Sequence, residues 1–304
     1  MNYFIIKSQS FSRLAWISAF ILTLTFNSRM VFSQTADSVK PLKHYRVNYF
    51  VSGAIIAAGA ATDAFAIDRI KNKAAISDQE IATLNPDILN SIDRWALHQD
   101  PSQYRHYATI SDYAQIPIFV LLPAALAFDK KIRKDWLDIL FMYLEGHIVT
   151  FTFYNYSWLG PTFQDRYRPL TYYDQIKMID RESGNNRNSF YSGHTASVAF
   201  TSFFVTKVFC DYHPEFSAGT KILLYTAALI PPVLEGYLRV KALAHFPSDD
   251  MVGLSLGAAL GIIIPELHKI HYKGISVGVQ SSPNTLGLGL NWKIPGCKRC
   301  GLVD

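Results

Sequence analysis

The stretch "RVKALAHFPSDDMVGLSLGAALGIII", residues 239–264, joins a charged segment to a long apolar one. His245 lies six residues after Arg239, and Asp249 lies four residues after His245. Pro247 suits the first turn of a helix, where its missing N–H needs no partner. The stretch therefore predicts an apolar helix that begins near Pro247. Its polar residues form either a solvated turn or part of an active site at a membrane surface.

The composition of the 304-residue chain indicates contact with something other than water. Hydrophobic residues make up 49% of the chain and charged residues only 17%, whereas soluble domains carry roughly 25% charged residues. The formal net charge of +5 comes from scattered basic residues, so the dense basic stripe of a nucleic-acid-binding protein is missing. We therefore expect the bilayer as a partner and no nucleic acid.

The rest of the chain contains several apolar segments of helical length. They span residues 47–67, 113–128, 136–158, 197–210, 221–238 and 251–267. Polar residues inside them, including Glu145 and His147, should face the bundle and bond to neighbouring helices, and Pro231 with Pro232 should kink one segment. A large soluble helical protein is the alternative. The number and length of the segments favour an all-α, multi-helix, membrane-embedded bundle.

The two ends of the chain differ from this bundle. Lys7 and Arg13 precede the apolar run 14–26, and Ser33 offers a cleavage position, which is typical of a signal peptide or an N-terminal anchor. Residues 275–294 alternate apolar with small or polar residues around a Ser-Ser-Pro-Asn turn, which predicts a β-hairpin. The predicted parts are a signal peptide or anchor, a helical membrane domain and a tail, at residues 1–34, 35–267 and 268–304.

The three cysteines, Cys210, Cys297 and Cys300, are too few for a disulfide framework. Cys297 and Cys300 form a single CxxC with no second pair and no histidine nearby. This pattern is weak evidence for a metal or redox site, so we expect an ordinary tail and no metal ligands.

The loop at residues 129–135 indicates how the bundle lies in the membrane. It carries four basic residues, and short basic loops are usually cytoplasmic. Segments 159–190 and 239–250 then lie on the extracytoplasmic side. A cleaved signal peptide conflicts with this orientation, because a spanning helix at 47–67 would invert every later segment. The conflict disappears if 47–67 lies in the interface or is re-entrant, or if part of 68–109 also enters the membrane.

Two further short motifs precede the opening stretch. "RYRP" contributes Arg166 and Arg168, and "FYSGHT" contributes Ser192, Gly193 and His194. Taken alone, each motif has an ordinary reading as a juxtamembrane charge, a helix cap or a polar helix start. Together they fall at helix ends on one predicted side of the membrane, which indicates a shared site.

The residue types in these motifs suit the chemistry of phosphate. Guanidinium groups stay charged and bind phosphate oxygens in pairs. Ser192 and Gly193 at a helix start offer backbone N–H groups, and glycine permits close approach. Of two histidines, one can attack phosphorus while the other protonates the departing oxygen. Asp249 can reach back to a ring nitrogen of His245 and fix its tautomer.

In this order, Arg-Pro, Ser-Gly-His and Arg-x5-His-x3-Asp resemble the type 2 phosphatidic acid phosphatase superfamily over roughly residues 110–267. That group includes membrane lipid phosphatases, soluble bacterial acid phosphatases and vanadium-dependent haloperoxidases. The resemblance implies an enzyme without metal or cofactor, in which His245 forms a phosphohistidine, His194 is the general acid and Asp249 orients His245. It also implies phosphate binding by Arg168, Arg239 and the backbone at Ser192 and Gly193.

This sequence departs from the family pattern at three positions. Pro161 stands where the family usually has a lysine, Tyr191 replaces a proline and Leu238 replaces a serine. Losing the lysine removes one cation, which weakens binding and rate because charge stabilisation dominates such transition states. Arg166 is the nearest replacement, and we predict that it also binds phosphate. Because both histidines and the aspartate are present, we expect an active enzyme.

The leading hypothesis is therefore an integral-membrane phosphatase that acts on a lipid phosphate monoester or diphosphate outside the cytoplasm. One alternative is vanadate-dependent halide oxidation, because the same residues would bind vanadate. The other is a phospholipid- or phosphate-binding membrane protein that has lost catalysis, which Pro161 alone supports. The sequence leaves the particular lipid and the oligomeric state open.

Overall fold

The computed structural model describes residues 43–157, 160–270, 275–282 and 285–292. The predicted signal peptide or anchor, Cys297 and Cys300 lie outside these residues. The α-helices are α2 Tyr49–Lys71, α3 Asp78–Ala82, α4 Tyr104–Ala125, α5 Trp136–Tyr156, α6 Met178–Arg181, α7 Gly193–Tyr212, α8 Ala218–Ala227, α9 Ile230–Lys241 and α10 Pro247–His268. The 3-10 helices are η1 Pro86–Ile88, η2 Asp93–His98, η3 Pro101–Gln103, η4 Leu126–Phe128, η5 Arg133–Asp135, η6 Pro169–Tyr172 and η7 Gly184–Arg187.

The prediction of an all-α membrane-type bundle is confirmed. Three helical stretches in the described part of the chain are long and apolar enough to cross a membrane, Tyr49–Lys71, Pro101–Phe128 and Pro247–His268. Many of their large apolar side chains point away from the protein, including Phe65 and Leu121, as side chains that face lipid do. The predicted kink at the double proline is also present, because the chain breaks between α8 and α9.

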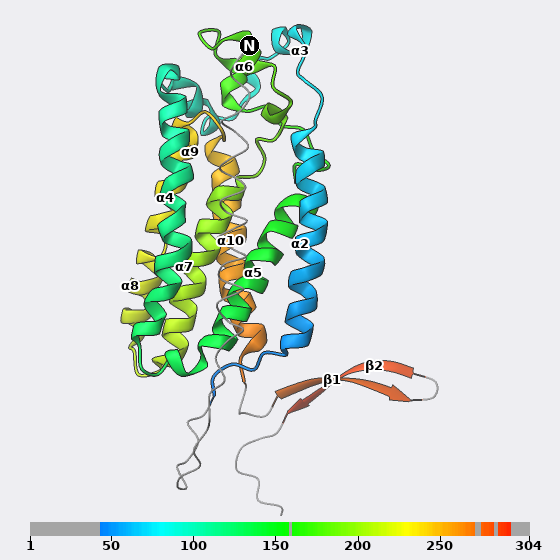
Figure 1. Cartoon of the computed structure of the whole chain (residues 1–304), viewed down its shortest axis with the longest axis vertical. Helices are drawn as coiled ribbons and strands as arrows, with labels where there is room; N and C mark the ends of the chain where they lie inside the picture. The colour runs from blue at the N-terminus through cyan, green and yellow to red at the C-terminus, as the bar shows by residue number, and fades with distance from the viewer. Residues whose placement is uncertain (1–42, 158–159, 271–274, 283–284, 293–304) are drawn as a thin grey trace, which may run out of the picture. The chain divides into compact units, whose positions relative to one another are not determined.

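Helices α7 and α10 form the centre of the bundle and pack unusually closely (Figure 1). Gly253, Gly257 and Gly261 lie four residues apart on the face of α10 that touches α7. A Cβ atom at Gly253 would lie 2.5 Å from the Ser192 carbonyl oxygen, and one at Gly261 would lie 2.7 Å from the Phe200 carbonyl oxygen. The glycines therefore allow backbone contact between the helices, as small residues do in membrane bundles. This contact sets the N-terminal ends of α7 and α10 side by side.

The remaining long helices surround this pair, with α5 packed on α2 and α4 packed on α9 and α7 (Figure 1). Glu145 of α5 lies 3.4 Å from His268 Nε2, and His147 Nε2 lies 3.1 Å from the Thr201 hydroxyl. The predicted helix-to-helix hydrogen bond is thus confirmed for His147, whereas Glu145 makes an ion-pair contact with α10 and its Oε2 has no hydrogen-bond partner among the described residues.

Helix α2 runs along α5 from one end of the bundle to the other. Near its start, the ring of His44 lies 4.3 Å from that of Tyr212, whose hydroxyl donates to Asp135 at 2.6 Å. At its end, Asn188 donates to the Ile70 carbonyl at 3.2 Å. Residue 44 and the basic loop therefore lie at one end, and the segments that carry the motifs lie at the other. This path argues against the expectation that segment 47–67 lies in the membrane interface or re-enters the same side.

The C-terminal residues form strands β1 Ile275–Ser282 and β2 Thr285–Trp292. The strands are antiparallel, with Ile275 opposite Trp292 and Ser282 opposite Thr285. This is the hairpin that the alternating sequence predicts.

Candidate active site

The three sequence motifs come together where α7 and α10 begin. The Ser192 N–H donates to the Asp249 carbonyl at 3.2 Å, which joins the second motif to the third. The first motif reaches the third through a contact between Arg166 and Asp249. His194 and Arg239 share a partner, Asp112 of α4. Segments far apart in sequence therefore build one site at one end of the bundle.

The turn between α9 and α10 presents His245 to this site. Leu243 adopts φ 53° and is fully buried, in a cluster with Leu170, Tyr173 and Ile176. A left-handed conformation is costly for leucine and persists because its surroundings hold it. The fixed turn leaves His245 only 2% exposed.

His245 is held in one tautomer by a backbone carbonyl. Its Nδ1 lies 2.5 Å from the Ser189 carbonyl oxygen, and a carbonyl can only accept, so Nδ1 carries the proton and Nε2 carries the lone pair. Desolvation and the charges of Arg239 and Arg168 hold the pKa of His245 well below 6.5. The ring is therefore neutral near pH 7, with a free nucleophilic nitrogen.

Asp249 acts on His245 indirectly, which corrects the predicted direct bond. Its Oδ2 lies 4.0 Å from His245 Nδ1 and instead accepts from the Ser189 hydroxyl at 2.6 Å and from the Phe246 N–H at 2.8 Å. Because Asp249 sits in the first turn of α10, its side chain is closest to the N–H groups of its own helix start. Asp249 thus anchors Ser189, whose carbonyl orients the ring.

Arg166 is committed to structural contacts, which argues against its predicted role in phosphate binding. Its guanidinium contacts Asp249, lies 2.7 Å from Asp93 Oδ2 and donates to the Ser248 hydroxyl at 3.1 Å. It also lies over the Phe246 ring at 4.8 Å. Two buried carboxylates neutralise its charge, so it does not replace the missing lysine. Pro161, at the lysine position, is buried in the turn after α5.

Arg168 and Arg239 have donors to spare. The Nε atom of each is buried and has no hydrogen-bond partner among the described residues. Desolvation and the charge of Arg239 lower the pKa of Arg168 to about 10, which shows two cations close together. A buried donor without a partner is costly, and two neighbouring ones mark a place where an anion binds.

The start of α7 supplies the remaining motif residues. Ser192 is the N-cap, and its hydroxyl accepts from the Thr195 N–H at 3.4 Å. A Cβ atom at Gly193 would lie 3.2 Å from the ring of Tyr154 on α5, so glycine permits this close packing. His194 follows with a third of its side chain exposed and with Nε2 3.2 Å from Asp112 Oδ1.

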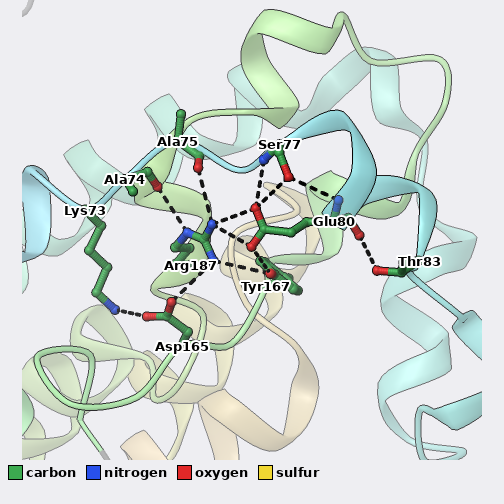
Figure 2. A network of polar contacts seen from close by, with 9 residues as sticks. All are labelled: Lys73, Ala74, Ala75, Ser77, Glu80, Thr83, Asp165, Tyr167 and Arg187. Carbon is green, nitrogen blue, oxygen red and sulfur yellow. Dashed lines mark hydrogen bonds and ion pairs between the residues drawn. The ribbon is translucent and has the colours of Figure 1, made fainter.

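A polar network outside the site fixes the position of the first motif (Figure 2). Arg187 forms an ion pair with Glu80 at 2.7 Å and also contacts Asp165 and Tyr167, which flank Arg166. Bonds from the Ser77 N–H and from Arg187 lower the pKa of Glu80 to about 2, so this pair stays charged. The network ties the segment before Arg168 to α3 and η7.

Three residues of the site escaped the sequence analysis. Asp93 binds Arg166 and Ser248, Asp112 binds His194 and Arg239, and Ser189 binds His245 and Asp249. Ser189 lies only three residues before Ser192, so its closeness to the second motif was a usable signal. Asp93 and Asp112 lie far upstream, and no spacing in the sequence links them to the motifs.

In the described ranges, no group of three or more His, Cys, Asp or Glu side chains is arranged to hold a metal ion. The independence from metal that the family resemblance implies therefore stays a prediction. The polar groups that do gather at the site are an arginine pair, two histidines and their carboxylate and carbonyl partners.

The site thus lies at one end of a helical bundle that contains helices long enough to span a membrane. Residues 135–272, which include all three motifs, match the model of the PAP2 superfamily, so the resemblance of the motifs to this family is confirmed. A similar solved structure is "Crystal structure of the first transmembrane PAP2 type phosphatidylglycerolphosphate phosphatase from Bacillus subtilis", at 19% sequence identity and a TM-score of 0.38, covering 72% of this chain and 92% of that chain. No curated protein matches the chain.

Proposed function

We propose that this protein is an integral-membrane phosphatase that hydrolyses a lipid phosphate monoester or diphosphate through a phosphohistidine on His245. One observation carries the proposal. A neutral, tautomerically fixed His245 lies among the charges of Arg168 and Arg239, whose buried Nε atoms lack partners in the described part of the chain. A nucleophile beside an anion-binding site is what phosphoryl transfer to an enzyme requires.

In the proposed reaction, Arg168 and Arg239 bind the phosphate oxygens while His245 Nε2 attacks phosphorus. A P–N bond forms as the P–O bond to the leaving group breaks, and His194 gives its proton to the leaving oxygen. The Ser189 carbonyl accepts from Nδ1–H and stabilises the positive charge that develops on the ring. Water then attacks phosphorus, His194 takes its proton, and the P–N bond breaks to release phosphate.

Phosphate release from a panel of lipid phosphates in detergent tests this proposal. Wild type should release phosphate from at least one lipid, and acid quenching during turnover should trap a phosphorylated protein that His245→Ala does not form. Full activity of the His245→Ala variant would exclude His245 as the nucleophile. Absence of wild-type activity across the panel would favour a phosphate- or phospholipid-binding protein, the alternative that Pro161 supports.

We also propose that the site faces the extracytoplasmic side, because the basic loop 129–135 lies at the opposite end and short basic loops are usually cytoplasmic. Single cysteines at Lys130 and at Asp174, which is 91% exposed at the site end, can be labelled on intact cells with an impermeant maleimide. Cys297 and Cys300 are replaced by serine beforehand. Labelling at position 174 alone supports the proposal, and labelling at position 130 alone reverses it.

A further inference from the structure

Asp112 places a carboxylate directly against the proposed catalytic groups. Its Oδ1 lies 3.2 Å from His194 Nε2 and 3.4 Å from Arg239 Nη1. The side chain is 60% exposed, so its charge faces whatever enters the site. Helix α4, which carries Asp112, lies outside residues 135–272 that match the PAP2 model. The motifs therefore do not account for this residue.

The position of Asp112 coincides with the place that the leaving group must take. His194 is proposed to protonate the leaving oxygen, which must then come within hydrogen-bond distance of a ring nitrogen. Asp112 Oδ1 lies within hydrogen-bond distance of His194 Nε2, at 3.2 Å, and so stands where the leaving oxygen has to be. When substrate binds, the leaving group therefore displaces the carboxylate slightly and lies beside it.

Carboxyl groups gather on this side of the site. Glu235 is 2% exposed and accepts from the Ser111 hydroxyl at 2.5 Å, and Ser111 in turn accepts from Arg239 at 3.3 Å. One guanidinium thus faces two carboxylates, Asp112 and Glu235. Arg168, in contrast, makes no side-chain ion pair within the described ranges and leaves its buried Nε for the transferred phosphoryl group.

We infer that Asp112 selects substrates by the charge of the leaving group, so that the enzyme prefers phosphate monoesters to diphosphates. This inference rests on the proposed function. In a monoester the leaving group is an alcohol, whose neighbouring hydroxyl groups can donate to Asp112. In a diphosphate, attack at the terminal phosphorus breaks the bond to the bridging oxygen, and the group that leaves is itself a phosphate. Its negative oxygens would lie beside Asp112 and be repelled.

The test uses one lipid alcohol carrying either one or two phosphates, farnesyl monophosphate and farnesyl diphosphate. With the full-length protein in detergent, wild type should show a kcat/KM at least about tenfold higher for the monophosphate, since like charges a few ångströms apart are strongly unfavourable. Asp112→Asn keeps a hydrogen-bonding side chain of the same shape without the charge. It should lower the ratio of monophosphate to diphosphate kcat/KM about tenfold, and Asp112→Glu should restore the preference.

Asp174→Asn is the matched control, because it removes the same charge from a 91% exposed side chain at the same end of the bundle. Its ratio should stay within about twofold of wild type. An Asp112→Asn protein that is active and keeps the wild-type ratio of monophosphate to diphosphate kcat/KM overturns the inference. Equal loss of activity on the two substrates also overturns it, because this result would assign Asp112 to the positioning of His194. If wild type releases no phosphate from either substrate or from the lipid panel, the proposed function itself is wrong. Any measurable ratio, changed or unchanged in Asp112→Asn, means that the protein is a phosphatase.

Discussion

The two ends of α7 and α10 hold buried positive charge in opposite ways. At their C-terminal ends, Lys207 lies 2.5 Å from Asp211 and 2.6 Å from Glu266, and Lys269 lies 2.6 Å from the other Asp211 oxygen. Tyr45 adds a hydrogen bond to Asp211 at 2.7 Å. Every partner here is part of the fold, so the cluster ties α7, α10 and the segment before α2 together.

At their N-terminal ends, the same helices border Arg168 and Arg239, whose buried Nε atoms lack partners in the described residues. Such donors destabilise a folded protein and are retained where a ligand completes them. Arg166 lies at this end but resembles the paired lysines, because Asp93 and Asp249 neutralise it. The comparison teaches that a buried guanidinium N–H without a partner, and not membership of a motif, distinguishes a binding arginine from a structural one.

The largest expected difference between the two ends concerns their histidines. His245→Ala should lower kcat by at least about a thousandfold, because nothing replaces the attacking nitrogen. His213 at the other end contacts Asp129 and Glu215, each at 2.8 Å, so His213→Ala should keep kcat and lower the Tm. Phosphate release and thermal unfolding in detergent check both variants. Equal losses of activity would contradict the division between the two ends.

The next largest effect should come from the unpaired guanidinium. Arg168→Gln should lower kcat/KM about a hundredfold, since one lost charge at a developing oxyanion costs about this much. Its Tm should stay close to that of wild type, because the Arg168 side chain forms no salt bridge with another described residue and its Nε is unpartnered. Arg181→Gln is the control. That arginine donates to the Thr171 carbonyl at 3.0 Å and pairs with Asp174, so kcat/KM should stay within about twofold.

The fold and the centre of the site were predictable because both follow from local signals. Long apolar segments can only satisfy their backbone in lipid as helices, and Pro247 and Ser192 mark where α10 and α7 begin. Motifs at two helix starts then fall together once those helices are neighbours. The glycines at 253, 257 and 261 carried the signal for that contact at a spacing of four, but the spacing does not name the partner helix.

The pairing of charges was not predictable, because it depends on contacts between distant parts of the chain. Arg166 counts as a free cation in the sequence, and only the folded chain brings Asp93 to it from 73 residues upstream. Spacing, the position of Asp249 in the first helical turn and the family resemblance all predict a direct bond from Asp249 to His245, whereas Ser189 lies between them and takes both bonds. Residue type and spacing thus identify the chemistry, and tertiary contacts decide which group performs it.

A smaller effect, on stability alone, should follow from breaking the paired cluster. Asp211→Asn leaves Lys207 and Lys269 with less compensation, and Lys207 is only 9% exposed. Breaking a buried ion pair costs about 3 kcal/mol, so the Tm in detergent should fall clearly. The kcat of the folded fraction should not change, because the cluster lies at the end of the helices away from the site. A large fall in kcat at unchanged Tm would show that the two ends are coupled.

The smallest effect should be a shift of the pH profile that reports the charge of Arg168 beside His245. The pKa of His245 is lowered by desolvation and by Arg239 and Arg168, so the ring stays neutral and reactive as the pH falls through 6.5. The acidic limb of the wild-type kcat/KM profile should therefore lie well below pH 6.5, the usual pKa of histidine. Arg168→Gln removes one of these charges and should move the acidic limb upward by about half a unit to one unit. The substrate phosphate also titrates near pH 6, but it does so equally for both proteins, so the difference between the profiles belongs to the enzyme. If the acidic limbs of the wild-type and Arg168→Gln profiles coincide, Arg168 does not act on His245 and belongs with the structural arginines.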